Sequence, residues 1–95
     1  MKKVTPERLI RFVGEREGMR LRTLIRRRPF SAHTSGDGLE YVPSTNKPRL
    51  HEMKWLAGVC KEFNRSGSFR PSNYIHLTMN ASYTLALIDK YLKAP

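Results

Sequence analysis

The sequence is short of cysteine, of acidic side chains and of long apolar runs. Cys60 is the only cysteine, which excludes an intrachain disulfide, and its apolar helical surroundings predict a buried, reduced thiol. The longest apolar stretch, near residues 85–88, is far shorter than the roughly 20 residues of a membrane-spanning helix. The basic start at residues 1–3 is not followed by the apolar core of a signal peptide. These absences predict a soluble, cytoplasmic protein.

Few side chains are placed to support catalysis or to hold a metal ion. The chain has only 8 Asp and Glu, and they form no cluster of the kind that a metal-dependent nuclease needs. His33, His51 and His76 lie far apart in the sequence, without the spacing of a shared metal site. No serine or cysteine nucleophile motif occurs. We therefore expect no enzymatic activity, no metal and no cofactor.

Positive charge, by contrast, is abundant. The 18 Lys and Arg outnumber the 8 acids and give a formal net charge of +10. Residues 1–30 hold ten Lys and Arg and three acids, so this first third carries most of the excess. A surface so charged attracts polyanions whatever its fold. The charge balance therefore favours a nucleic-acid partner.

The length predicts a single domain, 1–95, whose first part, residues 1–49, is a basic helix followed by a β-hairpin. Thr5 as N-cap and Pro6 in the first turn predict a helix that ends near Gly14. Residues 19–42 are typical of β structure, because two extended runs flank a Gly-Asp-Gly break. By composition, residues 43–49 are expected to form a loop.

The second part, residues 50–95, predicts a three-helix unit and thus an α+β fold class for the whole. Apolar spacing predicts helices over residues 50–64, 71–78 and 81–93, with Met79-Asn80 as a tight joint and Asn80 as N-cap of the last helix. That last helix has an apolar stripe that includes Leu85. Its opposite face is expected to be exposed and comprises Ser82, Tyr83, Ala86, Asp89, Lys90 and Lys93.

Over residues 50–93, the element order, the short joint and the apolar spacing of Ile75, Leu77, Ala81, Leu85 and Ile88 resemble the helix-turn-helix fold and its winged-helix relatives. The resemblance implies that the last helix presents its outer face to the DNA major groove, while the preceding helix and the lead-in 68–70 touch the backbone. A winged helix continues into a C-terminal β-hairpin, which this chain does not have before Pro95.

Five arginines, Arg20, Arg22, Arg26, Arg27 and Arg28, occur within nine residues without an acid among them. If the strand continued through this run, all but Arg27 would share one face and could meet phosphates along a backbone. The residues that we expect to contact nucleic acid are Arg20, Arg22, Arg26, Arg27, Arg28, Lys47, Arg49, Arg70, Asn80, Ser82, Tyr83 and Lys90.

The sequence thus favours a small, basic, non-enzymatic protein that binds nucleic acid. We favour duplex DNA over RNA as the ligand, since the sequence lacks the aromatic strand motif of common RNA-binding sheets. The alternative is a protein–protein interaction module, or a homodimer, that binds an acidic partner through Trp55, Tyr83 or Tyr91. A cognate site, the oligomeric state and whether the chain is a fragment of a longer protein stay open.

Overall fold

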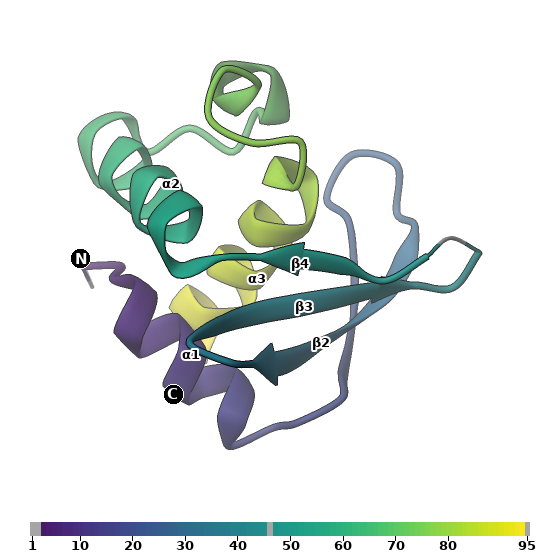
Figure 1. Cartoon of the computed structure of the whole chain (residues 1–95). Coiled ribbons are helices and arrows are strands. Elements are labelled where there is room, and N and C mark those ends of the chain that lie inside the picture. Colours follow the sequence, from purple (N-terminus) through teal and green to yellow (C-terminus); the bar gives the residue numbers. More distant parts are fainter. Residues whose placement is uncertain (1–2, 46, 95) are drawn as a thin grey trace.

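The computed structural model describes residues 3–45 and 47–94 and has the expected α+β architecture (Figure 1). Its elements, in chain order, are α1 (Pro6–Gly14), β1 (Met19–Arg22), β2 (Pro29–Ser35), β3 (Gly38–Pro43), β4 (Arg49–His51), α2 (Met53–Ser66), the 3-10 helix η1 (Pro71–Tyr74) and α3 (Ala81–Lys93). The first helix has its predicted bounds, and the Thr5 hydroxyl caps it by accepting from the backbone N–H of Arg8 at 3.2 Å.

The four strands form one antiparallel sheet in the order β1-β2-β3-β4. The predicted hairpin is confirmed, since Ser35 pairs with Gly38 across a tight turn. Strand β4 was not expected: Arg49–His51 pairs with β3 where a loop and then a helix were predicted, and α2 begins only at Met53. Position 46 of the predicted loop lies outside the described residues.

The helices cover one face of the sheet, with α3 running behind the strands in the view of Figure 1. Burial alternates along the strands accordingly. Leu21, Phe30 and Tyr41 face the helices and are buried, whereas their neighbours in sequence are more exposed. The buried apolar residues form one core, to which α1, α2, α3 and the strands β1, β2 and β3 all contribute.

Helix α3 has the predicted bounds but is more deeply buried than its pattern indicates. Residues 84–88 are all buried, so Ala86 does not face solvent, and that part of the prediction is wrong. The Tyr83 ring packs edge-on against Phe30 at 5.0 Å between centroids and lies 5.6 Å from Tyr41. The helix is surrounded by the sheet, α1, α2 and η1, which leaves little of it exposed.

The predicted helix over 71–78 is also shorter than expected. Only residues 71–74 are helical, as one 3-10 turn, and turns follow. Tyr74 anchors the end of the 3-10 turn, because its ring is fully buried and its hydroxyl donates to the Ser68 carbonyl at 2.7 Å. The backbone N–H groups of both Leu77 and Thr78 donate to the Tyr74 carbonyl, which closes the turn.

Three buried polar side chains join α3 to the sheet. Thr84 Oγ1 lies 2.8 Å from the Tyr41 hydroxyl and 2.9 Å from Nδ1 of His51. His51 is 1% exposed, and its Nε2 has no hydrogen-bond partner among the described residues. Burial lowers the pKa of His51 to about 4, which keeps the ring neutral near pH 7.

This buried histidine predicts acid sensitivity. The folded pKa of about 4 lies below the unfolded value of about 6.5, so the stabilisation is fully present above pH 6.5 and is lost as the pH falls through 4. We expect the free energy of unfolding to fall by about 3 kcal/mol from this group between pH 7 and pH 4. Urea denaturation of wild type and His51→Asn measures it; equal pH slopes for both proteins would contradict it.

Gly38, at the start of β3, lies against the segment that leads from β4 into α2. A Cβ on this residue would lie 2.5 Å from the backbone oxygen of His51 and 3.2 Å from the backbone nitrogen of Met53. Both atoms belong to paired or helical backbone and have little room to move. The absence of a side chain at position 38 therefore permits the unexpected strand β4 to pair closely.

We accordingly expect Gly38→Ala to lower the free energy of unfolding by about 1–3 kcal/mol through overpacking. Urea denaturation provides the measurement. Gly36→Asn is the matched control, because Gly36 has φ +57°, which asparagine tolerates, and a Cβ there meets no atom of the described chain within 4 Å. Equal stability of the two variants would show that the close approach at Gly38 relaxes without cost.

Candidate nucleic-acid interface

The β1–β2 hairpin loop, residues 23–28, carries the densest positive charge. Thr23 shapes it: its backbone N–H donates to the Arg28 carbonyl at 3.0 Å, and its buried hydroxyl accepts from the Arg28 N–H at 3.0 Å. Strand β1 therefore ends at Arg22, and the prediction that Arg26 and Arg28 extend a row along the strand is wrong. The arginines gather around a turn instead.

Arg27 holds an uncommon backbone conformation in this loop. Its φ of 58° is the only positive value for a non-glycine residue in the described ranges. A left-handed L-residue costs about 1–2 kcal/mol. The conformation is fixed by two hydrogen bonds: the Arg27 N–H donates to the Thr23 carbonyl at 3.0 Å, and the Arg22 guanidinium donates to the Arg27 carbonyl at 3.1 Å.

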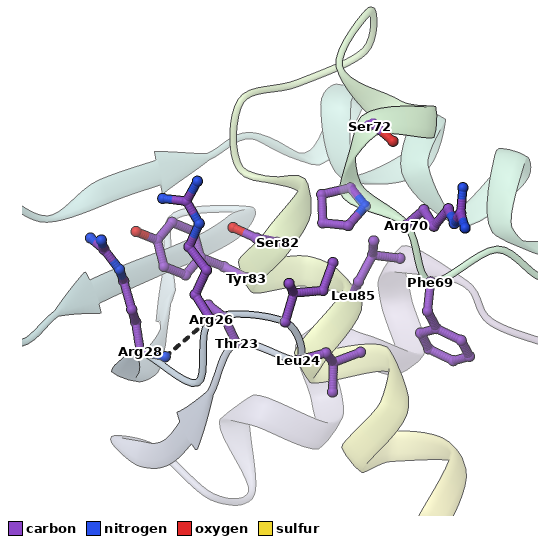
Figure 2. A pocket seen from close by; sticks show the side chains of 12 residues that line it. Thr23, Leu24, Arg26, Arg28, Phe69, Arg70, Ser72, Ser82, Tyr83 and Leu85 are labelled. Atoms are coloured by element: carbon purple, nitrogen blue, oxygen red, sulfur yellow. Dashed lines mark hydrogen bonds between the residues drawn. The ribbon is translucent and has the colours of Figure 1, made fainter.

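A pocket of about 580 Å³ opens on one side of this loop; we call it the loop–α3 pocket (Figure 2). It is enclosed by the hairpin loop, by the segment before and within η1, and by the first turns of α3. Its lining residues are Thr23, Leu24, Ile25, Arg26, Arg28, Phe69, Arg70, Pro71, Ser72, Ser82, Tyr83 and Leu85. In Figure 2, Arg26 and Arg28 stand on one side and Arg70 on the other, and no acid is among the lining residues.

A second hollow, of about 420 Å³, lies between β1 and the exposed side of α3; we call it the β1–α3 groove. Leu24 lines both hollows, so they adjoin across the hairpin loop. The groove is lined by Arg20, Leu21, Arg22, Leu24, Arg27, Pro29, Ala86, Asp89, Lys90 and Lys93. Five of these are cations, and the one acid, Asp89, accepts from Lys93 Nζ at 3.1 Å.

Nine of the twelve residues predicted from the sequence line one of these two hollows. The loop–α3 pocket takes Arg26, Arg28, Arg70, Ser82 and Tyr83, and the groove takes Arg20, Arg22, Arg27 and Lys90. Arg49 is close to the pocket, since its guanidinium carbon lies 6.0 Å from the centroid of the Tyr83 ring. Exposed Lys47 lines neither hollow.

Asn80 has a different role from the one expected. It occupies the N-cap position of α3, but its side chain accepts no hydrogen bond from the helix. Its amide instead donates to the Leu50 carbonyl of β4 at 3.1 Å. The predicted side-chain cap is therefore wrong, and the residue connects the start of α3 to the sheet.

Leu24 and Ile25 line the pocket without having been expected there, whereas Phe69, Ser72 and Lys93 belong to segments or faces that were expected near the nucleic acid but were not among the twelve predicted contacts. Ile25 is 67% exposed although it is a large apolar residue, and its position directly before three arginines was the available signal. Phe69 packs edge-on against Phe63 at 5.0 Å between centroids and also lines the pocket. Both the core and the pocket therefore use this ring.

Cys60 is buried as predicted, and burial raises the pKa of its thiol to about 12. Among the described residues, no three His, Cys, Asp or Glu lie together in a way that could hold a metal ion. No helix among these residues is long and apolar enough to cross a membrane.

The chain matches no protein-family model, and comparisons with curated proteins and solved structures found no match.

The strained residue in the loop yields a test. Arg27→Gly removes the left-handed penalty and adds freedom to the unfolded chain, so we expect a net gain of about 0.5–1 kcal/mol in the free energy of unfolding. Arg26→Gly, which loses the same charge without a positive φ, is the control and should be less stable than wild type. Urea denaturation measures the stability of both variants, and an Arg27→Gly variant less stable than wild type would show that the Arg27 backbone is not strained.

Proposed function

We propose that this protein binds nucleic acid, with duplex DNA as the first candidate, through the hairpin loop and the two hollows beside it. The observation that carries the proposal is the convergence of cations from separate segments. Arginines from β1, the loop 23–28 and position 70 line adjoining hollows together with Lys90 of α3. Phosphate groups along a backbone suit such a surface, because guanidinium groups bind them in pairs of hydrogen bonds.

The charges of this surface are largely unneutralised within the protein. Of the ion pairs in the described residues, only Lys93 with Asp89 involves a residue of either hollow. The hollow-lining arginines are all exposed, and apart from Arg22, whose guanidinium donates to the Arg27 carbonyl, their side chains make no hydrogen bond among the described residues. Release of counterions from DNA then supplies much of the binding free energy.

The proposal includes contacts from α3 to DNA bases, but fewer α3 residues are available for them than the helix-turn-helix resemblance implies. Tyr83 and Ala86, two of its expected reading positions, pack against the sheet or lie buried. Ser82 and Lys90 remain at the surface for base edges. We therefore propose that phosphate contacts dominate the affinity and that sequence preference is modest.

A second candidate is a protein-interaction module, and a specific observation favours it. Leu50, Trp55, Ile75 and Met79 are exposed large apolar residues, and Met79 is 84% exposed. Of the aromatic residues expected at such an interface, Tyr83 packs on Phe30 and Tyr91 packs edge-on against Phe12 at 5.5 Å, so Trp55 is the exposed one. A concentration-dependent dimer in light scattering, together with no affinity for DNA, would favour this candidate.

The DNA proposal predicts a steep salt dependence. With about six phosphate contacts, the affinity for a labelled duplex should fall with a log–log slope near −5 between about 50 and 200 mM salt. Replacing Arg26, Arg27 and Arg28 together by Ala should reduce that slope by about 3 and weaken binding to every sequence to a similar extent. Fluorescence anisotropy at several salt concentrations measures both effects.

The matched control replaces Arg11, Lys54 and Lys61 by Ala, which removes the same charge from exposed positions of α1 and α2 outside both hollows. It should keep most of the affinity. A flat salt profile of the wild type would refute DNA binding, and equal losses in the two triple variants would show that net charge alone, without a defined surface, attracts the duplex.

A further inference from the structure

The loop–α3 pocket has both cations and apolar residues, so it suits more than contact with a phosphate backbone. We propose that it holds a single unpaired nucleotide of the bound nucleic acid, with the phosphate against the arginines and the base against the apolar wall. The inference rests on the proposed function and adds the form of nucleic acid that the surface prefers.

The charged part of the pocket suits a phosphate. Arg26 and Arg28 offer guanidinium groups on one side of the pocket and Arg70 offers one on the other, and no carboxylate among the lining residues competes for a phosphate bound at either side. Ser72, Ser82 and Tyr83 also line the pocket, and side chains of these types can donate to phosphate or sugar oxygens. Such a set of donors selects an anion that also carries polar oxygens.

The apolar part of the pocket fits a base. Leu24, Ile25, Phe69 and Leu85 line it, and Ile25 is 67% exposed at the tip of the hairpin. Phe69 and Tyr83 are held in place from behind by Phe63 and Phe30, at 5.0 Å between ring centroids in each pair. A base inserted here covers exposed apolar surface without requiring these rings to reorganise.

The size of the pocket separates a nucleotide from a duplex. A volume of about 580 Å³ lies in the range of small-molecule sites of about 300–1,000 Å³, and a double helix cannot enter it. The β1–α3 groove, on the other side of the hairpin loop, has five cations for the phosphates that flank the unpaired position. The hairpin loop therefore lies between the groove, which would bind the flanking nucleic-acid strand, and the pocket, which would bind one nucleotide.

The experiment compares three labelled probes of one sequence: a perfect duplex, the same duplex with one bulged nucleotide, and that bulge without its base. We expect the bulged probe to bind about tenfold more tightly than the other two, because stacking a base on protein side chains is worth about that factor. Anisotropy titrations at one salt concentration measure the ratios.

Two variants locate the effect. Ile25→Ser and Arg70→Gln alter exposed side chains of the pocket, and each should bring the ratio between bulged and perfect duplex close to one. Lys61→Gln removes a charge from the exposed surface of α2 and should leave the ratio at about ten. Circular dichroism confirms that each variant is folded.

The outcomes separate this inference from the proposed function. Equal, salt-dependent affinity for perfect and bulged duplexes overturns the nucleotide pocket and leaves DNA binding standing. Equal affinity for the bulge with and without its base also overturns it, since the protein then responds to the bend of the duplex. If none of the probes binds, both the inference and the proposed function fail.

Discussion

The position of α3 against the sheet depends on one hydroxyl group, that of Thr84 near the start of the helix. It bonds to Tyr41 of β3 and to His51 of β4, so a shift of the helix along the sheet would break both contacts inside the core. An unpaired buried polar group is costly, and the register of α3 is therefore well defined. With α3 fixed, its first turn lies beside the hairpin loop, and Ser82 and Tyr83 line the same pocket as Arg26.

The basic surface is, by contrast, the least relaxed part of the fold. It combines a left-handed Arg27, an isoleucine that is 67% exposed and arginines without acidic partners, none of which stabilises the fold. Strained backbone clusters at ligand sites and switch regions, so this feature supports the proposed interface. The buried network thus fixes the α3 side of the pocket, while hydrogen bonds within the loop fix the other side.

Local signals predicted the parts of the fold that are locally determined. The cap at Thr5, the Gly-Asp-Gly turn and the period of α3 gave correct bounds, because each depends on neighbouring residues. Strand β4 is too short for a pattern and needs the close approach at Gly38, which no local rule contains. The burial of Ala86 depends likewise on tertiary packing, and the end of β1 at Arg22 depends on the hydrogen bonds between Thr23 and Arg28 in the loop. Composition indicated the cations of the surface, but their grouping into two hollows required the fold.

The bond from the Asn80 amide to the Leu50 carbonyl has a consequence for self-association. Strand β4 lies at the border of the sheet, where free backbone groups can template intermolecular strand addition. Here the border is only Arg49–His51, one of its acceptors is occupied by a side chain, and Arg49 adds repulsion between copies. At this border the fold thus keeps a solvent-facing leucine on a strand too short to offer a second molecule the hydrogen-bonding row from which amyloid-like stacking begins.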